Sequence, residues 1–450
     1  FCIMNIIISG DSEVAFHLAK LLAAEKHDIT LISPSAEMIR MIEAESDLLT
    51  IQGDSTSASL LEQAGAKKAD LLISAHTDGR LNLLTAIMGK HLGAKKCIAK
   101  VYEPEYLSRE CIAHYKSLGI DHLVSPEQIA AKEISNLLQN TAATEIFDFS
   151  ENQLSIMLVK LESGAPVIGK CLNEIAREYQ DLNFRAVAVH RGSKTRIPRG
   201  EDAFLEGDLA YVVTKPDGIG HLLALGGKKQ FEVRNVMIFG GGAVGSQAAL
   251  NLEKKFNVKL FELNPARIAE LSNLFQNTLM IQGDARNISL LESEGIAQMD
   301  AVVAVTNNSE TNILSCLLAR RYGVKKTIAL VENIDFIDIS QTVGIDTIIN
   351  KKLATASYIL RFTMTAQVIS TKCLTGIDAE VFEFLAVEGS SITKKPIKKL
   401  RFPENAIIGG FIREGIGYIA KGDMQIQPGD KVVVFALPQA FSLVDRFFKP

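Results

Sequence analysis

A glycine-rich segment near the middle of the chain has the residue types and the spacing of a dinucleotide-binding loop. The apolar run 236–239 leads into Gly240-Gly-Gly-Ala-Val-Gly245, and an amphipathic helical pattern follows. In such a loop Gly240 permits a tight turn, Gly242 lets the backbone approach a pyrophosphate, and Gly245 lets the helix pack closely on the sheet. The helix N-terminus then presents its amide groups to the phosphates. The alternative is a glycine-rich turn that serves packing alone.

Two polar residues beyond the next apolar run extend this candidate site. The segment Lys259-Leu-Phe-Glu262 places a carboxylate at the end of a second apolar strand. There Glu262 can accept a hydrogen bond from a ribose 2′-OH; the alternative is an exposed acid at a strand end. Arg267, on the following helix, can reach a phosphate from its own or a neighbouring subunit, although a solvated arginine is the simpler interpretation.

Two further strand ends carry polar residues at the same edge of the predicted sheet. Asp284 either faces the adenosine or caps the helix that carries Ser289. The segment 306–308 either lines the pyrophosphate cleft or caps the helix that follows it. The predicted cofactor-binding set is Gly240, Gly242, Ala243, Val244, Gly245, Glu262, Asn264, Arg267, Gly283, Asp284, Ala285, Thr306, Asn307 and Asn308.

The elements that must position these residues occur twice. Apolar runs alternate with helical patterns over residues 4–140 and again over 233–360, which predicts βαβ units and a parallel sheet in each stretch. Matching residues keep one offset of 230 positions (240 − 10 for the first glycines), as Ile51-Gln-Gly-Asp54 and Ile281-Gln-Gly-Asp284 do. One register held over so many positions predicts a duplicated, doubly wound Rossmann-like domain.

The first copy departs from the dinucleotide pattern. Ser12 and Ala15 replace the second and third glycines, and Asp11 and Glu13 bring negative charge towards the position of a pyrophosphate. Ile32 stands where the second copy has Glu262, so no carboxylate awaits a ribose hydroxyl. We therefore expect a first pocket that is degenerate, weak or used for another ligand. Its weaker candidate residues are Gly10, Ser12, Val14, Ser33, Asp54, His76 and Thr77.

His76 needs separate consideration, because a histidine in a cleft can sense pH. Its counterpart under the offset of 230 is Thr306, so the two copies share no chemistry at this position. A spectator polar residue is the preferred interpretation.

A smaller unit rich in short strand patterns follows each large one. The predicted organisation is a first large domain at 4–140, a small domain at 145–228, a second large domain at 233–360 and a second small domain at 370–450. Linkers are expected near 140–150, 222–233 and 365–376. The basic clusters in the small domains, at 191–199 and 394–399, can receive an anionic ligand or an acidic partner, but solvated hairpins are the preferred interpretation.

Composition excludes several classes of function. With 47% hydrophobic and 22% charged residues and a net charge of −4, the chain resembles an ordinary globular protein and offers no global reason to bind nucleic acid. No apolar stretch is long enough to span a bilayer, the start lacks the pattern of a secretory signal, and Met4 can be the natural first residue. The six cysteines form no CxxC or metal-ligand spacing, so reduced thiols and no metal site are expected.

Taken together, the sequence resembles the bacterial TrkA family of potassium-uptake regulators, in which RCK (KTN) domains alternate with RCK-C (TrkA-C) domains. The resemblance covers essentially the whole chain. It depends on the doubled nucleotide domain, on the Gly-Asp pair after each third strand, and on Pro198-Arg-Gly200 with Gly207-Asp208, echoed by Ala420-Lys-Gly422 with Gly429-Asp430. The implied fold class is α/β: two Rossmann-like doubly wound parallel-sheet domains alternating with two small α+β RCK-C domains.

The resemblance also implies a function. Family members are peripheral cytoplasmic subunits on the inner face of the bacterial cell membrane, where they assemble into a ring beneath a pore of the TrkH/TrkG type. NAD(H), or ATP, ADP or AMP, in the Rossmann pockets sets the shape of the ring and thereby the conductance of the pore. A tetramer of chains is the assembly that the resemblance favours.

Two other classes of function compete with a regulator. An NAD-dependent oxidoreductase needs a substrate cleft with a general acid or base beside the nicotinamide, but the small units are poor in histidine and show no Lys/His/Tyr arrangement. We therefore expect no enzyme. A redox-sensing transcription factor needs a DNA-binding element, and the sequence contains neither a helix-turn-helix appendage nor a basic helix.

Overall fold

The structure is a computed structural model that describes residues 3–24, 27–139, 145–150, 152–179, 183–192, 194–227, 231–334, 336–364, 367–374, 377 and 379–450. The linker positions 140–144, 228–230 and 365–366, together with Cys2, lie outside these residues. Residues 1–129 and 351–365 form one compact unit, and residues 130–350 and 366–450 form the other. Each unit is described by itself.

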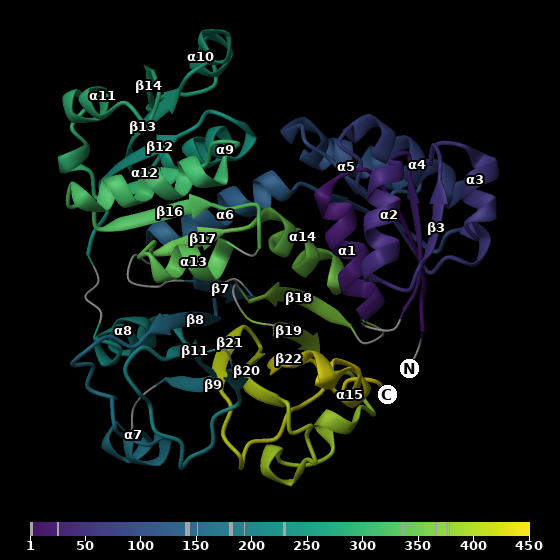
Figure 1. Cartoon of the computed structure of the whole chain (residues 1–450). Coiled ribbons are helices and arrows are strands. Elements are labelled where there is room, and N and C mark those ends of the chain that lie inside the picture. The colour runs from purple at the N-terminus through teal and green to yellow at the C-terminus, as the bar shows by residue number, and fades with distance from the viewer. Residues whose placement is uncertain are drawn as a thin grey trace. The chain divides into compact units, whose positions relative to one another are not determined.

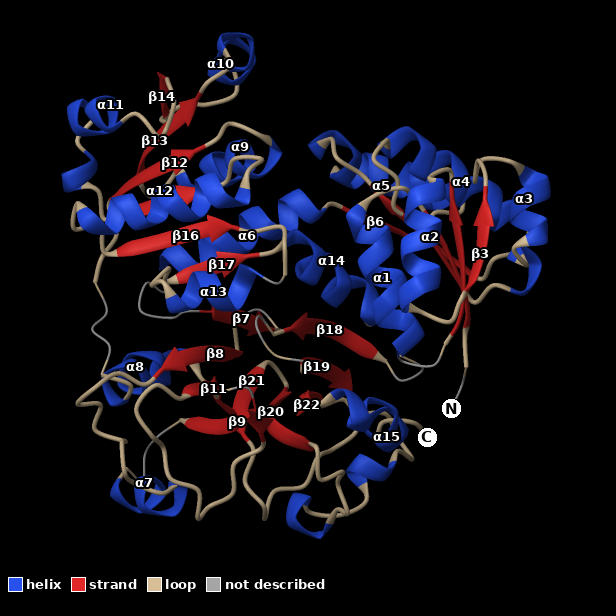
Figure 2. Ribbon diagram, in the orientation of Figure 1, coloured by secondary structure: helices blue, strands red, loops and turns tan. Residues whose placement is uncertain are grey.

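The first unit contains a six-stranded parallel sheet of strand order β3-β2-β1-β4-β5-β6 (Figures 1 and 2). Its strands are nearly continuous apolar runs because helices cover both faces of such a sheet. The strands are β1 (Asn5–Ser9), β2 (Asp28–Ser33), β3 (Leu49–Gln52), β4 (Leu71–Ser74), β5 (Lys96–Lys100) and β6 (His122–Val124). The helices are α1 (Glu13–Ala24), α2 (Ala36–Glu45), α3 (Ala58–Gln63), α4 (Gly79–His91), α5 (Arg109–Ser117) and the start of α6 (Pro126–Gln139).

The second unit repeats this sheet with the order β14-β13-β12-β15-β16-β17. Its strands are β12 (Asn235–Phe239), β13 (Asn257–Glu262), β14 (Leu279–Gln282), β15 (Ala301–Ala304), β16 (Lys326–Leu330) and β17 (Thr347–Ile349). Its helices are α9 (Ala243–Leu252), α10 (Pro265–Ser272), α11 (Ile288–Ser293), α12 (Ser309–Arg321) and α13 (Phe336–Thr342). In both sheets the strand order reverses between the first and the fourth strand of the copy, which is the switch point where doubly wound sheets bind ligands.

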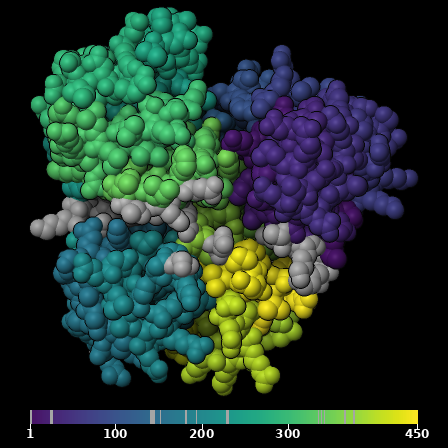
Figure 3. Space-filling view, viewed as in Figure 1, coloured from purple at the N-terminus to yellow at the C-terminus, as the bar shows by residue number. Residues whose placement is uncertain are grey.

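Two five-stranded antiparallel sheets complete the second unit and lie side by side in it, teal and yellow in Figure 3. The first contains β7 (Glu145–Phe149), β8 (Leu154–Lys160), β9 (Phe184–Arg191), β10 (Lys194–Arg196) and β11 (Leu209–Thr214), with helices α7 (Leu172–Glu178) and α8 (Ile219–Leu225). The second contains β18 (Val368–Cys373), β19 (Glu380–Leu385), β20 (Ala406–Arg413), β21 (Ile416–Ile419) and β22 (Lys431–Ala436), with helix α15 (Phe441–Phe447). The two sheets share one apolar core. The predicted fold class is confirmed.

Two helices pack where sequence order alone does not place them. Helix α14 (Lys351–Leu360) follows the second parallel sheet in the chain but packs in the first unit against α1, where Lys352 pairs with Glu13 at 2.5 Å. Residues 130–138 of α6 follow the first sheet in the chain and pack into the core of the second unit with β12 and α9.

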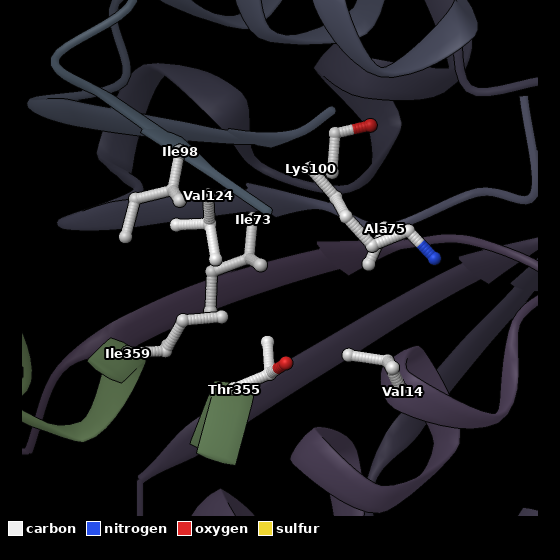
Figure 4. Close-up of a pocket in the computed structure, with 9 residues that line it drawn as sticks. Val14, Ile73, Ala75, Ile98, Lys100, Val124, Thr355 and Ile359 are labelled. Carbon is white, nitrogen blue, oxygen red and sulfur yellow. The ribbon is translucent and has the colours of Figure 1, made fainter. Parts of the chain in front are cut away.

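A small void in the first unit marks the packing of α14 on the sheet. Figure 4 shows Thr355 and Ile359 of α14 facing β4, β5 and Val14. Lys100, at the end of β5, also lines the void, and burial lowers the pKa of its ammonium to about 8. Among the described helices, none is long and apolar enough to cross a membrane.

Candidate functional site

The glycine loop of the second copy has the geometry that its sequence predicts. Gly240 has a φ of +107°, a left-handed value that glycine adopts without strain. A Cβ on Gly245 would lie 1.9 Å from the carbonyl oxygen of Gly240, so this position tolerates no side chain. A Cβ on Gly242 would meet nothing within 4 Å. The positive φ of Gly240 and the close contact at Gly245 are requirements of the fold. The absence of a side chain at Gly242 is different, because it keeps space open above the loop.

The start of α9 faces this open space. Gly242 is the N-cap residue of the helix, and the first turn contains Ala243 and Val244. Amide groups of a first turn have no carbonyl partner within their own helix. They are therefore donors suited to an anion, and the helix dipole adds a favourable positive potential there.

Glu262, at the end of β13, holds the glycine loop and the next helix together. One carboxylate oxygen accepts from the amide of Gly241 at 2.8 Å, and the other accepts from the amide of Asn264 at 2.8 Å. Each oxygen retains a second lone pair, so the carboxylate can still accept from a hydroxyl group. The side chain of Asn264 caps α10 by accepting from the amide of Ala266.

Arg267 lies closer to the loop than a solvated arginine would. Its Nε donates to the carbonyl oxygen of Gly241 at 3.2 Å, and its guanidinium also pairs with Glu270 at 2.8 Å. The arginine is only partly exposed. The guanidinium of Arg267 therefore places a positive charge beside Gly241, the residue before Gly242.

The third strand end is organised by local turns. Asp284 accepts from the backbone amide of Arg286 at 2.8 Å and pairs with its guanidinium, and the side-chain hydrogen bond from Arg286 lowers the pKa of that carboxyl group. The helix with Ser289 is capped by Asn287, not by Asp284. Gly283 and Ala285 flank the carboxylate, and a Cβ on Gly283 would lie 2.2 Å from a methyl carbon of Leu290.

The fourth strand end combines a cap with an open backbone group. Asn308 caps α12 by accepting from the amide of Thr311. Thr306 donates both its amide and its hydroxyl to Asn312. The amide of Asn307 makes no hydrogen bond to any residue that the structure describes. This strand end therefore offers one donor at the switch point.

Sequence reasoning assigned no role to Asn312 or to its counterpart Asn82. Each side chain bridges the ends of two strands: Asn312 donates to the carbonyls of Thr306 and Leu330, and Asn82 donates to those of His76 and Lys100. Both asparagines are buried. The signal was available, because Asn82 and Asn312 keep the offset of 230 positions (312 − 82).

In the first copy, side chains form hydrogen bonds across the corresponding switch point. Asp11 accepts from the amide of Thr77 at 2.8 Å and from its hydroxyl at 3.2 Å. Ser12 donates its hydroxyl to the carbonyl oxygen of Ala75. His76 is 3% exposed, and its Nδ1 lies 3.8 Å from the carboxylate of Asp11. Burial lowers the pKa of His76 despite that carboxylate.

The other first-copy candidates have structural partners. Gly10 has a φ of +159°, and a Cβ there would lie 2.6 Å from the carbonyl oxygen of Ala75. Val14 is buried in α1, and Ser33 accepts from the amide of Ser35 at 3.2 Å. Asp54 accepts from the amide and the hydroxyl of Thr56, which lowers the pKa of the carboxyl group.

The small domains each contain a buried aspartate paired with an arginine. Asp208 receives two hydrogen bonds from Arg191, at 2.6 and 2.7 Å, and Asp430 receives two from Arg413, at 2.8 and 2.7 Å. These aspartates belong to the Gly-Asp pairs noted in the sequence. Arg191 is therefore anchored and is not simply part of a solvated hairpin. Among the residues that the structure describes, no group of three or more His, Cys, Asp or Glu side chains could hold a metal ion.

The fold and the glycine loop define a chain of two Rossmann-type domains alternating with two small antiparallel-sheet domains. The family model described as the TrkA-N domain matches residues 6–126 and 236–351, and the one described as the TrkA-C domain matches residues 156–225 and 381–449. The chain thus belongs to the TrkA family, with its TrkA-N and TrkA-C domains in tandem.

Full-length relatives support this membership. The chain is 30% identical over 459 residues to "Trk system potassium uptake protein TrkA homolog 1" of Methanosarcina mazei, with 99% of this chain and 100% of the relative covered. It is 30% identical over 453 residues to "Trk system potassium uptake protein TrkA" of Vibrio alginolyticus, with 99% of each covered. Both relatives are named as proteins of potassium uptake.

Solved structures share the fold. The GsuK channel matches with a TM-score of 0.63 at 17% identity, over 99% of this chain and 79% of that one. The GsuK channel bound to NAD matches with a TM-score of 0.61 at 18% identity, over 99% of this chain and 79% of that one. A GsuK structure bound to ADP matches with a TM-score of 0.51 at 15% identity, over 80% and 69%.

Proposed function

We propose that this chain is a cytosolic regulatory subunit that gates a membrane potassium-uptake channel or transporter of the TrkH/TrkG type. The chain is peripheral on the inner face of the cell membrane and associates into a ring, with a tetramer favoured. NAD(H) is the favoured ligand, with ATP, ADP or AMP as alternatives. A nucleotide that binds one shape of the ring more tightly than the other shifts the equilibrium between the two shapes.

The observation that carries the proposal is the open glycine loop at the second switch point. Gly242 leaves space above the start of α9, and Glu262 retains lone pairs at the end of β13. Phosphates would bind the amides of Ala243 and Val244, and a ribose would bind Glu262. Arg267 would add a positive charge to the phosphate side. Because the sequence shows no Lys/His/Tyr arrangement of the kind that hydride transfer needs beside the nicotinamide, we propose binding and not catalysis.

Calorimetric titration tests nucleotide binding. NADH, NAD, ATP and ADP are titrated separately into the wild-type chain and into Gly242→Asp, which places a carboxylate in the open space. We expect saturable binding of at least one nucleotide by the wild type and its loss in the variant. A Gly242→Asp chain that binds as the wild type does would contradict the assigned site.

The regulatory part of the proposal needs two further measurements. Sedimentation velocity of the wild type with and without the bound nucleotide should reveal a change in shape or assembly, and Gly242→Asp should show none.

An alternative function, an NAD-dependent oxidoreductase with a tandem Rossmann fold, predicts turnover. If the chain oxidised or reduced members of a panel of alcohols and hydroxy acids with NAD(H), the regulatory proposal would be replaced by that alternative.

A further inference from the structure

At the two switch points, the loops that follow the first and the fourth strand differ between the copies, and three of the differing matched positions bear on anion binding. The first copy has Asp11 and Ser12 where the second has Gly241 and Gly242 (241 − 11 and 242 − 12 both give 230). Opposite them, Thr77 corresponds to Asn307. These residues belong to the loops that follow the first and the fourth strand of each sheet, between which a dinucleotide pyrophosphate enters.

In the first copy, hydrogen bonds join the two loops directly. The carboxylate of Asp11 receives the amide and the hydroxyl of Thr77, and the hydroxyl of Ser12 reaches the carbonyl of Ala75. In the second copy the glycines carry no side chain that could cross, and the amide of Asn307 has no partner among the described residues. The same backbone donor is thus satisfied by a carboxylate in one copy and open in the other.

The polar groups around Asp11 are of the kind that a phosphate would meet. The carboxylate lies in the loop before α1, whose N-terminus favours a negative charge. The Nδ1 atom of His76 is buried, has no hydrogen-bond partner and lies 3.8 Å from the Asp11 carboxylate. On the other side Ser12 accepts from the amide of Ala15 at 3.4 Å, so a side chain of the loop also meets a donor of the first turn.

We propose that Asp11 is a built-in substitute for a ligand phosphate, which joins the two loops of the first switch point and keeps nucleotide out of it. This inference rests on the proposed nucleotide function and assigns ligand binding to the second copy alone. The first copy is then held in one arrangement by hydrogen bonds to a side chain of its own, and the second copy is held only when a ligand bridges its loops.

The inference predicts that removing the carboxylate creates an anion site. In Asp11→Ala, the amide and hydroxyl of Thr77 lose their acceptor, and His76 faces the vacated space. An anion with several oxygens can then accept from these groups. Inorganic pyrophosphate is a suitable probe because it carries no base or ribose and needs only the phosphate positions.

The experiment uses full-length chains that carry Gly242→Asp, so that the second site is already blocked. The parent Gly242→Asp chain is compared with the same chain carrying Asp11→Ala and with one carrying Asp11→Asn, which keeps an acceptor oxygen. Thermal unfolding and calorimetry are measured with and without pyrophosphate. We expect pyrophosphate to bind the Asp11→Ala chain about tenfold or more tightly than the parent, with a raised melting temperature, and to leave the parent and Asp11→Asn unchanged.

The possible outcomes separate this inference from the proposed function. Equal pyrophosphate binding by the parent and the Asp11→Ala chain would overturn the inference, as would a wild type that binds two nucleotides per chain and retains one in Gly242→Asp. If Asp11→Ala does not fold, Asp11→Gly with Ser12→Gly, which restores the glycines of the second copy, answers the same question. A wild type that binds no nucleotide at all would overturn the proposed function, whereas the pyrophosphate comparison would still decide the role of Asp11.

Discussion

Replacing Glu380 by glutamine should stabilise the second unit in a way that depends on pH. Glu380 begins β19 and is 5% exposed; one of its carboxyl oxygens meets the Cys373 thiol at 2.5 Å, and the other has no partner. Nearby, the buried Lys372 already pairs with Glu133 at 2.5 Å and with Glu145 at 3.3 Å. One lysine thus balances two carboxylates, and a third negative charge would be uncompensated.

The size and sign of the effect follow from the pKa of Glu380. Burial raises the pKa of this carboxyl group from 4.5 to about 8, although the Cys373 hydrogen bond and Lys372 oppose the shift. Below pH 4.5 the group is protonated in both folded and unfolded chains, and the substitution changes little. Between pH 4.5 and 8 the folded chain alone keeps the proton, so the wild type loses about 1.4 kcal/mol of stability per pH unit. Above pH 8 the loss is complete, with an upper bound of about 5 kcal/mol.

Urea unfolding followed by circular dichroism provides the assay, since the chain contains no tryptophan for fluorescence. The free energy of unfolding of Glu380→Gln should exceed that of the wild type by roughly 2 to 5 kcal/mol at pH 9 and by less than about 1 kcal/mol at pH 4.5. Glu388→Gln, which removes an exposed carboxylate, is the matched control and should follow the wild type throughout. A stability difference between Glu380→Gln and the wild type that stays the same from pH 4.5 to pH 9 would refute the reasoning.

Two further predictions concern the loop and the small domains. Gly245→Ala should lower the free energy of unfolding by about 3 kcal/mol or more, because its Cβ would lie 1.9 Å from the Gly240 carbonyl oxygen. Its matched control, Gly242→Ala, should unfold in urea as the wild type does, because a Cβ there meets nothing within 4 Å. The same variant should bind nucleotide more weakly in calorimetry. Asp430→Asn should cost about 2 kcal/mol in urea unfolding, because Arg413 loses its anionic partner and one of the two acceptor oxygens; an unchanged midpoint would show that the pair is dispensable.

The parallel sheets could be predicted from the sequence because their signals are local and repeated. Apolar strands and helical patterns alternate, and the offset of 230 residues shows that both copies follow one plan. The glycine loop could be assigned residue by residue for the same reason: Gly240 needs a positive φ and Gly245 needs close packing, and both requirements are properties of single positions.

Pairings between distant residues could not be predicted in this way. The basic segment 191–199 reads as a solvated hairpin, but Arg191 of β9 lies beside Asp208, just before β11, because the two strands pair antiparallel. The pattern of α14 indicates that one helix face is buried without indicating which sheet buries it. Its salt bridge from Lys352 to Glu13 joins residues 339 positions apart (352 − 13), and no periodicity contains that information.

The contrast between the two copies has a consequence for how a duplicated domain can act as a switch. A ligand stabilises the arrangement that it binds by an amount that grows with its concentration relative to its dissociation constant. If the inference about Asp11 holds, the copy whose loops Asp11 and Thr77 already join gains nothing from the ligand. In that case only the copy with Gly242 and an open Asn307 amide responds to the ligand. One chain would therefore combine a first large domain whose loops are fixed with a second whose loops respond to nucleotide. Each nucleotide bound would then change the loop arrangement of the second large domain and leave that of the first unchanged.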